Sequence, residues 1–534
     1  MLNVFASDPF VRLPFTPQDG SGLNPILQHP YMAIHPPLLY AGMIGMTVPF
    51  AFGIAALAAR QLDNTWLRAM RRWLLIPWAF LGAGLLLGGK WAYVELGWGG
   101  YWGWDPVENA SLMPWLAATA LLHSVQIQER KGMLKVWNMV LLFFTFGMTI
   151  FGTFLTRSGI VSSVHAFAQS NVGTYFVVYL VLIILGSTFM LVRRLPDLKA
   201  ENHLESFASR ESAFLFNNWI LLALLFAVLW GTLFPVISEA VTGEKITVGA
   251  PFFNQVSIPM GLVLMFLTGA GPLFAWRRTS KEGFRRNFGA PAIWAAVTLI
   301  VVIAVGVRDF YALTSLTLCG FVGGSVVLEF VRGIAARRRT SAESVVVALA
   351  TLLAKSRRRY GGYLVHVAMV MLFVGFTGNA FSVDREIVLQ QGQSATVDDY
   401  TITFQTLAFG DDDSKSVSAA ALTLAQDGEF LATLVPERHL YKKAQQTTTE
   451  VSIYSSWFED FYIILVGFAD DNASAKFQIY VNPLVGCVWW GAALFVVSSL
   501  WTMWPSARDR RMARLDRESS RADTWEPALS GAAS

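Results

Sequence analysis

Tryptophan and glycine alternate in one segment of this chain in a pattern that could bind a ligand. Between Trp91 and Ser111 the sequence reads WAYVELGWGGYWGWDPVENAS, which holds four tryptophans and four glycines. The tryptophans offer large, flat, apolar faces, and the glycines let the backbone lie close to a bulky group. A belt of interfacial aromatic residues is the alternative, but such a belt needs no glycine beside its rings. Residues 91–111, the Trp-rich segment, therefore predict a platform for a flat hydrophobic ligand.

Two of the seven histidines are expected at the same membrane surface as the Trp-rich segment. His35 begins the first apolar span, within AIHPPLLY, and His165 follows the fourth span, within TRSGIVSSVHAF. The two imidazoles could therefore face one another across the Trp-rich segment.

Two further histidines lie inside apolar spans, His123 near the inner end of the third and His366 near the inner end of the tenth. An ionisable residue within a span is costly and indicates function, usually with a partner. Two neutral imidazoles at matched depth on different helices suit the axial coordination of a haem iron. The alternative is that each ring only forms a hydrogen bond between helices. The matched depth and the second, outer pair favour haem.

The elements that position these residues are membrane spans, because the chain is 54% hydrophobic and only 15% charged. Apolar runs near the length of a bilayer crossing predict eleven transmembrane helices. Their approximate ranges are 36–59, 73–96, 110–127, 134–155, 172–192, 216–238, 257–276, 290–306, 310–330, 361–381 and 483–504.

Positive charge orients these spans, because Lys and Arg are retained on the cytoplasmic side. Every second loop is basic, and the basic regions are residues 60–72, 130–135, 193–210, 277–286, 337–359 and the tail after residue 505. The Trp-rich segment is therefore predicted outside. The net charge of +4 reflects topology and interaction with membrane lipid, and it gives no support to a nucleic-acid partner.

One region outside the spans predicts a β domain on the outer side. Residues 382–480 contain alternating stretches such as TVDDYTITF, AAALTLAQDGEFLATLVP and FYIILVGF, with a turn at Asp427 and Gly428. The fold class is therefore all-α, a polytopic membrane protein with one external β-rich domain inserted before the last helix. The expected parts are an external segment 1–35, a bundle 36–381, the β domain 382–480, a last span 483–504 and a cytoplasmic basic tail 505–534.

The sequence lacks a disulfide framework, a CxxCH motif and a recognisable signal peptide. Its two cysteines, Cys319 and Cys487, lie in different spans, so no disulfide framework organises the fold. No CxxCH motif is present, so the chain is not itself a c-type cytochrome. Residues 1–28 hold no apolar run that resembles a signal peptide, although the charge pattern puts them outside. An upstream span is therefore expected to be missing.

Several of these motifs together resemble the CcmF/NrfE family of membrane haem lyases, which act in bacterial cytochrome c maturation. The resemblance rests on the tryptophan-rich WWD signature as WGGYWGWDPVENAS, on IHPPLLYAG, on GTFLTRSG followed by SVHAFA, and on the histidine-bearing tenth span. It extends from about Gly22 to the basic tail. Tyr101 and Gly103 stand where the family often has Trp and Phe, and the family's usual upstream spans are not seen.

The resemblance implies that the protein takes haem from a haem chaperone and attaches it to apocytochrome c. The cysteines of a CxxCH motif would add to the haem vinyl groups at the periplasmic face of the bacterial inner membrane. His35 and His165 would ligate the transient substrate haem, and His123 and His366 a resident haem b that serves in reduction. The implied partners are the chaperone, the apocytochrome with its thiol-presenting subunits, and quinol as an electron source.

The remaining candidate residues surround the outer histidine pair. Trp98, Trp102 and Trp104 would support the porphyrin, with Trp91 and Arg157 as further haem contacts. Asp105 is a candidate for proton transfer, but an acidic residue before Pro106 is equally expected to cap the following helix. Two other functions stay open: a haem exporter with the histidines as a relay, and a non-catalytic scaffold of the maturation complex. Internal repeats typical of transporters are not found.

Overall fold

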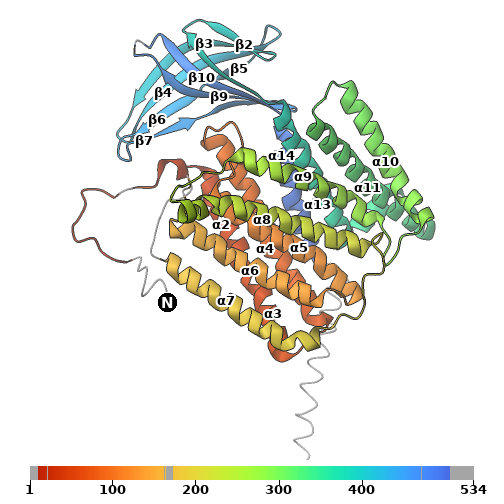
Figure 1. Ribbon diagram of the computed structural model, residues 1–534. Coiled ribbons are helices and arrows are strands. Elements are labelled where there is room, and N and C mark those ends of the chain that lie inside the picture. Colours follow the sequence, from red (N-terminus) through yellow and green to blue (C-terminus); the bar gives the residue numbers. More distant parts are fainter. Residues whose placement is uncertain (1–9, 21, 162, 164–171, 471, 506–534) are drawn as a thin grey trace, which may run out of the picture.

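The computed structural model describes residues 10–20, 22–161, 163, 172–470 and 472–505. A bundle of long helices carries a β-sandwich at one end, which we call the outer end (Figure 1). The opposite end, where the basic loops lie, is the inner end. The predicted fold class is confirmed.

The helical part runs through most of the chain. Its α-helices are α2 Pro30–Gly45, α3 Thr47–Ala59, α4 Asn64–Glu95, α5 Pro106–Lys131, α6 Lys135–Ser158, α7 Gly173–Arg194, α8 Arg210–Thr242, α9 Ala250–Ala270, α10 Lys281–Ala304, α11 Phe310–Ser341, α12 Val345–Lys355, α13 Arg357–Gly378 and α14 Val485–Met503. Short 3₁₀ turns lie at Pro25–Leu27, Leu195–Leu198, Gly271–Leu273 and Asn379–Phe381.

Within the described residues, ten helical segments are long and apolar enough to cross a membrane, so this is a multi-pass membrane protein. The first of them starts at Pro30, earlier than predicted, and breaks at Met46 between α2 and α3. The predicted span 110–127 lies in α5, which is not among the ten. It packs against α4, α6 and α8 and buries Asn109, Ser124 and Gln128. A central helix needs a less apolar surface than a lipid-facing one, which explains its composition.

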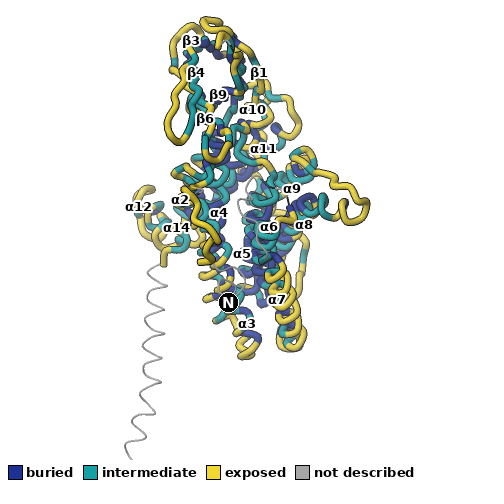
Figure 2. Tube along the Cα trace, turned by 90° about the vertical axis from the view of Figure 1, so that its left-hand side faces the viewer, coloured by how far each residue is buried: buried dark blue, intermediate teal, exposed yellow. Residues whose placement is uncertain are grey.

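Burial is distributed as this arrangement requires. Figure 2 shows buried residues along α5, α6 and α8, whereas α7 at the edge of the bundle is largely exposed. Only 11% of the apolar window of α7 and 6% of that of α10 is buried, as expected for helices whose side chains meet lipid.

Glycines bring α2 and α4 unusually close together. A Cβ added at Gly42 would lie 2.6 Å from the Cβ of Leu81, and one at Gly84 would lie 2.7 Å from a methyl carbon of Leu39. Small residues at a helix interface let two backbones approach within a membrane, where the hydrophobic effect gives no help. This close approach positions the start of α2 against the outer half of α4.

The β domain is a sandwich of two antiparallel sheets. One sheet has the order β1-β10-β9-β8, and the other has the order β2-β3-β4-β6-β7 with β5 paired to β4. The strands are β1 Val383–Gln390, β2 Ser394–Val397, β3 Tyr400–Asp411, β4 Lys415–Gln426, β5 Glu429–Leu434, β6 Glu437–Tyr441, β7 Gln446–Glu450, β8 Ser452–Ser455, β9 Glu459–Phe468 and β10 Ser474–Pro483.

The sequence pattern of this domain explains its core. Alternate residues of β10 are buried, among them Phe477, Ile479 and Val481, and they pack against Phe461 and Ile463 of β9. The predicted turn at Asp427 and Gly428 joins β4 to β5, with φ of 51° and 80°. The stretch TVDDYTITF holds a hairpin instead of one strand, because β2 ends at Val397 and β3 starts at Tyr400.

Candidate functional site

His35 lies at the outer end of α2 with its ring against α4. Its Nδ1 is 2.8 Å from the carbonyl oxygen of Gly84. A carbonyl only accepts, so Nδ1 carries the proton and Nε2 carries the lone pair that a metal needs. A Cβ at Gly88 would lie 2.4 Å from Cε1 of the ring. Two glycines of α4 therefore seat this imidazole and fix its tautomer.

The Trp loop, residues 96–105 between α4 and α5, packs against the next position of the same helix. A Cβ at Gly89 would lie 3.0 Å from the carbonyl oxygen of Tyr101. Gly97 and Gly99 have φ of 67° and 70°, which only glycine adopts without strain. His35 and the Trp loop thus lie against the same turn of α4.

The tryptophans of the candidate platform differ in their surroundings. The ring of Trp98 lies over Gly103, where a Cβ would be 2.6 Å from Cζ3, and Trp98 is 36% exposed. Trp102 and Trp104 meet edge to face with ring centres 5.8 Å apart. Trp91 is 1% exposed and belongs to the packed interior of α4. Trp98 and Trp102 are therefore the rings with most access to a ligand.

Trp104 is held by α9. Its ring stacks on Phe253 at 5.0 Å with an angle of 10° between the planes, and its Nε1 donates to Asn254 at 2.8 Å. Its carbonyl accepts from the buried Asn109. Trp104 also has φ of 56°, in the left-handed region. One face of this indole is therefore covered by the protein, and the ring anchors the end of the Trp loop.

Asp105 caps α5, as one of the two sequence interpretations expected. Its side chain accepts from the backbone N–H of Val107 at 2.9 Å and from the backbone N–H of Glu108. The carboxylate of Glu108 in turn accepts from the backbone N–H of Asp105 at 3.0 Å. This reciprocal pair is a capping box. Ser163 also donates to Asp105, at 2.6 Å. His165 lies outside the described residues.

Arg157, near the end of α6, points toward α2. Its Nη2 donates to the hydroxyl of Tyr40 at 3.1 Å, and Tyr40 lies on the same helix as His35. This contact puts a cation against α2, more than one helical turn from His35.

His123 on α5 is oriented in the same way as His35. Its Nδ1 is 2.8 Å from the carbonyl oxygen of Thr119, so Nδ1 donates and Nε2 carries the lone pair. The hydroxyl of Thr119 accepts from Nε1 of Trp78 at 2.8 Å. Trp78 in turn stacks on Trp115 with ring centres 5.7 Å apart. The orientation of this imidazole is therefore supported by α4.

His366 on α13 lies at the depth of His123. It is nine residues from the inner end of α13 at Arg357, and His123 is eight residues from the inner end of α5 at Lys131, or about 14 and about 12 Å at 1.5 Å per residue. The two rings are close enough to interact electrostatically. Nδ1 of His366 is buried without a hydrogen-bond partner among the described residues.

A haem iron fits this inner pair. A buried polar atom without a partner is costly, and a second ligand or donor would satisfy the ring of His366. The described residues contain no group of three or more His, Cys, Asp or Glu that could hold a metal ion. Two imidazoles suffice only for a metal whose other ligands come from elsewhere, and a porphyrin supplies four nitrogens.

The Trp loop is also fixed from the side of the β domain. Tyr93 of α4 donates to Asp460 of β9 at 3.0 Å, and Asn482 of β10 donates both to Tyr93 at 3.1 Å and to the carbonyl of Gly99 at 2.9 Å. Burial raises the pKa of Asp460, and the nearby charge of Lys90 lowers it. These bonds join the outer end of α4 to β9 and β10 and the Trp loop to β10, so the β domain is fixed against both.

Gly99 is expected to be irreplaceable in this contact. A Cβ there would lie 2.5 Å from the Tyr480 ring, at φ of 70°. Gly99→Ala should lower the free energy of unfolding by about 2–4 kcal/mol, from the left-handed backbone and from overpacking. Gly100→Ala is the matched control, because a Cβ there meets nothing within 4 Å. Denaturant titration followed by tryptophan fluorescence measures both, and equal midpoints would contradict this docking.

Several residues of the site were not predicted from the sequence. They are Gly84 and Gly88 beside His35, Thr119 and Trp78 beside His123, Phe253 and Asn254 beside Trp104, and Asp460 and Asn482 beside the Trp loop. Only Thr119 had a local signal, because a residue four positions before a helical histidine shares its face.

Two protein families match parts of the chain. The family described as "Cytochrome C assembly protein" matches residues 1–161, which include His35, the Trp loop and His123. The family described as "CcmF C-terminal beta-sandwich" matches residues 380–483, which coincide with the β domain.

Individual relatives match over almost the whole chain. The cytochrome c-type biogenesis protein CycK of Rhizobium meliloti is 36% identical over 97% of this chain and 78% of its own length. The protein CcmF of Haemophilus influenzae is 36% identical over 95% and 77%, and CcmF of Escherichia coli is 34% identical over 93% and 75%. A solved structure named "Cytochrome c Heme Lyase CcmF" has a TM-score of 0.74 at 29% identity, covering 90% of this chain and 73% of that one.

Proposed function

The chain belongs to the CcmF family of cytochrome c-type biogenesis proteins, whose general role is cytochrome c maturation, and we propose that it is a haem lyase. It attaches haem covalently to apocytochrome c at the outer end of the bundle. The observation that carries this proposal is the seating of His35 and the Trp loop on consecutive glycines of one helix, Gly88 and Gly89.

The reaction needs positioning more than proton transfer. Each cysteine thiol of a CxxCH motif adds across one haem vinyl group, so that sulfur bonds to one carbon and hydrogen to its neighbour. No atom is lost, and the step involves no net oxidation. Holding the substrate haem and the peptide in register replaces a bimolecular encounter, which is a large contribution to rate.

The outer residues hold the substrate haem. His35 ligates the iron through Nε2, with His165 as the second ligand. One of them yields when the histidine of the CxxCH motif takes its place. Trp98 and Trp102 support the porphyrin face, and Arg157 pairs with a propionate. Trp104 and Asp105 act through the Trp loop, whose end they stabilise, and Trp91 acts through the packing of α4 beneath it. Ser163, two positions before His165 in the sequence, is bonded to Asp105 and so supports a common site.

The inner residues hold a resident haem b. His123 and His366 would hold its iron through one ring nitrogen each, and Thr119 fixes the tautomer of His123. When bound, this group supplies electrons that keep the substrate iron reduced, with quinol as their source. Its site lies toward the inner end of the bundle, apart from the Trp loop at the outer end.

The setting follows from the same assignment. The protein resides in the bacterial inner membrane with its outer end in the periplasm. It receives haem from a chaperone and meets the apocytochrome together with the subunits that present its reduced thiols. An exporter would need no defined contact between the Trp loop and the β domain, whereas Asn482 builds one through the carbonyl of Gly99.

Gly88→Ala tests the lyase proposal without replacing any residue that is proposed to ligate haem. The new Cβ would lie 2.4 Å from Cε1 of His35 and displace the imidazole. Covalent attachment of haem to a co-expressed apocytochrome should fall about 10–100-fold, the usual effect of misplacing a ligand. Gly186→Ala in α7 is the control, since a Cβ there meets nothing within 4 Å. Haem staining of the cytochrome after denaturing electrophoresis is the readout, and full maturation in Gly88→Ala would argue for a scaffold.

A further inference from the structure

Three cations surround one indole at the inner end of the bundle. The ring centre of Trp276 is 5.2 Å from the guanidinium carbon of Arg130, 5.6 Å from Nζ of Lys131 and 5.4 Å from the guanidinium carbon of Arg210. Arg130 and Lys131 end α5, and Arg210 begins α8. Each contact is a cation–π interaction, but the three like charges repel one another.

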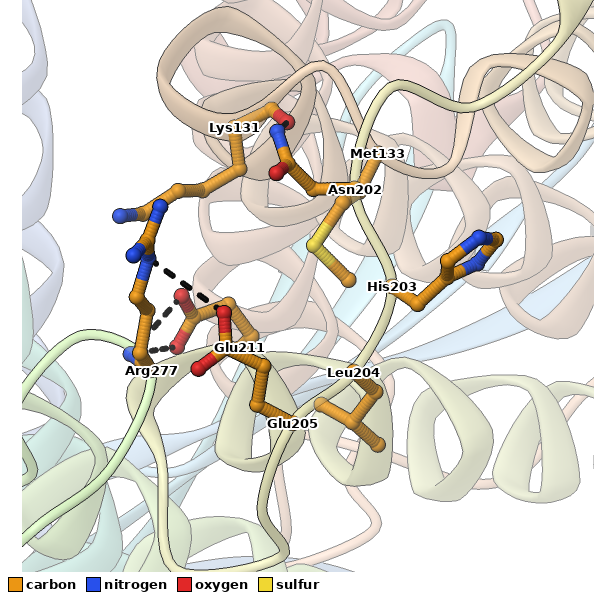
Figure 3. Close-up of a pocket in the computed structure, with 8 residues that line it drawn as sticks. All are labelled: Lys131, Met133, Asn202, His203, Leu204, Glu205, Glu211 and Arg277. Carbon is orange, nitrogen blue, oxygen red and sulfur yellow. Dashed lines mark hydrogen bonds and ion pairs between the residues drawn. The ribbon is translucent and has the colours of Figure 1, made fainter.

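These cations differ from two other arginines nearby, Arg277 and Arg359, which have acidic partners. Figure 3 shows Arg277 bound to Glu205 and Glu211, and Arg359 lies 2.6 Å from Glu329. In the part of the chain that the structure describes, Arg130, Lys131 and Arg210 form no salt bridge. A cluster of like charge without a carboxylate at salt-bridge distance is expected to bind an anion.

The cluster lies directly on the inner side of the two membrane histidines. Phe214 packs between His123 and Trp276, with ring centres 5.8 and 6.4 Å away. Arg210 is one turn before Phe214 and therefore on the same face of α8.

The same arginine also reaches the side of His366. Arg210 interacts electrostatically with Tyr363 and Glu329, and the Tyr363 ring is 6.4 Å from that of His366. A flat ligand held between His123 and His366 would thus have Arg210 at its inner edge.

We propose that Arg210, with Arg130 and Lys131, binds the two propionate carboxylates of the haem whose iron His123 and His366 ligate. This inference rests on the resident haem of the proposed function. A carboxylate within a bilayer is costly, so both propionates turn to the nearer aqueous surface. There they accept charge-assisted hydrogen bonds from guanidinium groups. Trp276 keeps the three cations in place while the ligand is absent.

The test compares haem b with its dimethyl ester, which has the same ring and iron but no carboxylate. Full-length protein from haem-depleted cells is titrated with each ligand, and the Soret band reports the affinity. The unaltered protein should bind haem b at least about tenfold more tightly than the ester, which corresponds to about 1.4 kcal/mol. Arg210→Gln should remove most of this preference, and Lys131→Gln part of it. Arg278 is an exposed arginine two residues after Trp276, and Arg278→Gln should leave the preference for haem b unchanged.

The ratio of the two affinities separates a loss of propionate contacts from a loss of folded protein. Arg210 also donates to carbonyls of Phe274 and Pro272, so its replacement could destabilise the protein. The ratio of the two ligand affinities within one variant does not depend on the folded fraction. Lys131→Gln replaces a side chain for which no bond to a backbone carbonyl is seen in the described residues. Equal affinities in the unaltered protein would assign the cations to anionic lipid and overturn the inference, while the resident haem would stand. If neither ligand bound, the resident haem itself would be refuted.

Discussion

His123→Ala and His366→Ala are each expected to remove nearly all of the reduced-minus-oxidised haem absorbance of the purified protein. Each change deletes one of the two imidazoles proposed to ligate the iron, and a haem held by one imidazole loses its low-spin spectrum. Among the residues that the structure describes, Nδ1 of His366 is buried without a hydrogen-bond partner, as expected of a ring that binds a further group. Absorption spectra of the detergent-purified variants give the result directly.

His203→Ala is the matched control for the inner pair. His203 is an exposed histidine at the inner end, on the wall of the pocket in Figure 3. Its removal should leave the spectrum unchanged. A His123→Gly variant that regains absorbance when imidazole is supplied would add support, because the ligand and its space would then be separable. An unchanged spectrum in His123→Ala would reject the assignment of the resident haem to this pair.

The fold was largely predictable because its signals are local. Apolar runs of bilayer length, basic loops and the Asp427–Gly428 turn each depend on neighbouring residues, and the structure confirms the elements they predict. The bounds of the first span were less predictable. Pro36 and Pro37 lie inside α2. A proline usually marks the start of a helix because within it a backbone hydrogen bond is lost, so a start at Pro30 was not expected.

The environment of the site was less predictable, because it depends on contacts distant in sequence. From the sequence, Trp104 is predicted to be an open platform residue. In the structure one face of its ring is covered by Phe253 of α9, 149 positions later in the chain. The bond between Tyr93 and Asp460 joins residues 367 positions apart. The hydrophobic periodicity of a sequence does not indicate which residues so far apart will meet. In the sequence, Gly88 and Gly89 look like ordinary helix residues. Only the structure shows that the ring of His35 packs against Gly88 and the carbonyl of Tyr101 against Gly89.

His35→Ala is expected to stop covalent attachment of haem to a co-expressed apocytochrome while the inner haem spectrum persists. The reason is geometric. Gly84 fixes the tautomer of His35, and Gly88 leaves its ring room beside the Trp loop. His165→Ala should have the same effect. Haem should accumulate on the upstream chaperone. The attached haem on the cytochrome, stained after denaturing electrophoresis, and the spectrum of the purified protein are measured in the same cells.

His29→Asn is the matched control, because His29 only caps α2 and asparagine caps a helix as well. Supplied imidazole should partly rescue His35→Gly, since the iron needs a ligand more than it needs that side chain. Imidazole should not rescue Trp102→Ala, because that variant lacks an aromatic surface for the porphyrin and not a ligand for the iron. This contrast distinguishes ligation from packing within one site. Complete cytochrome c maturation in the His35→Ala, His165→Ala double variant would exclude a lyase site at the Trp loop, and a scaffold role would then account better for its contact with the β domain.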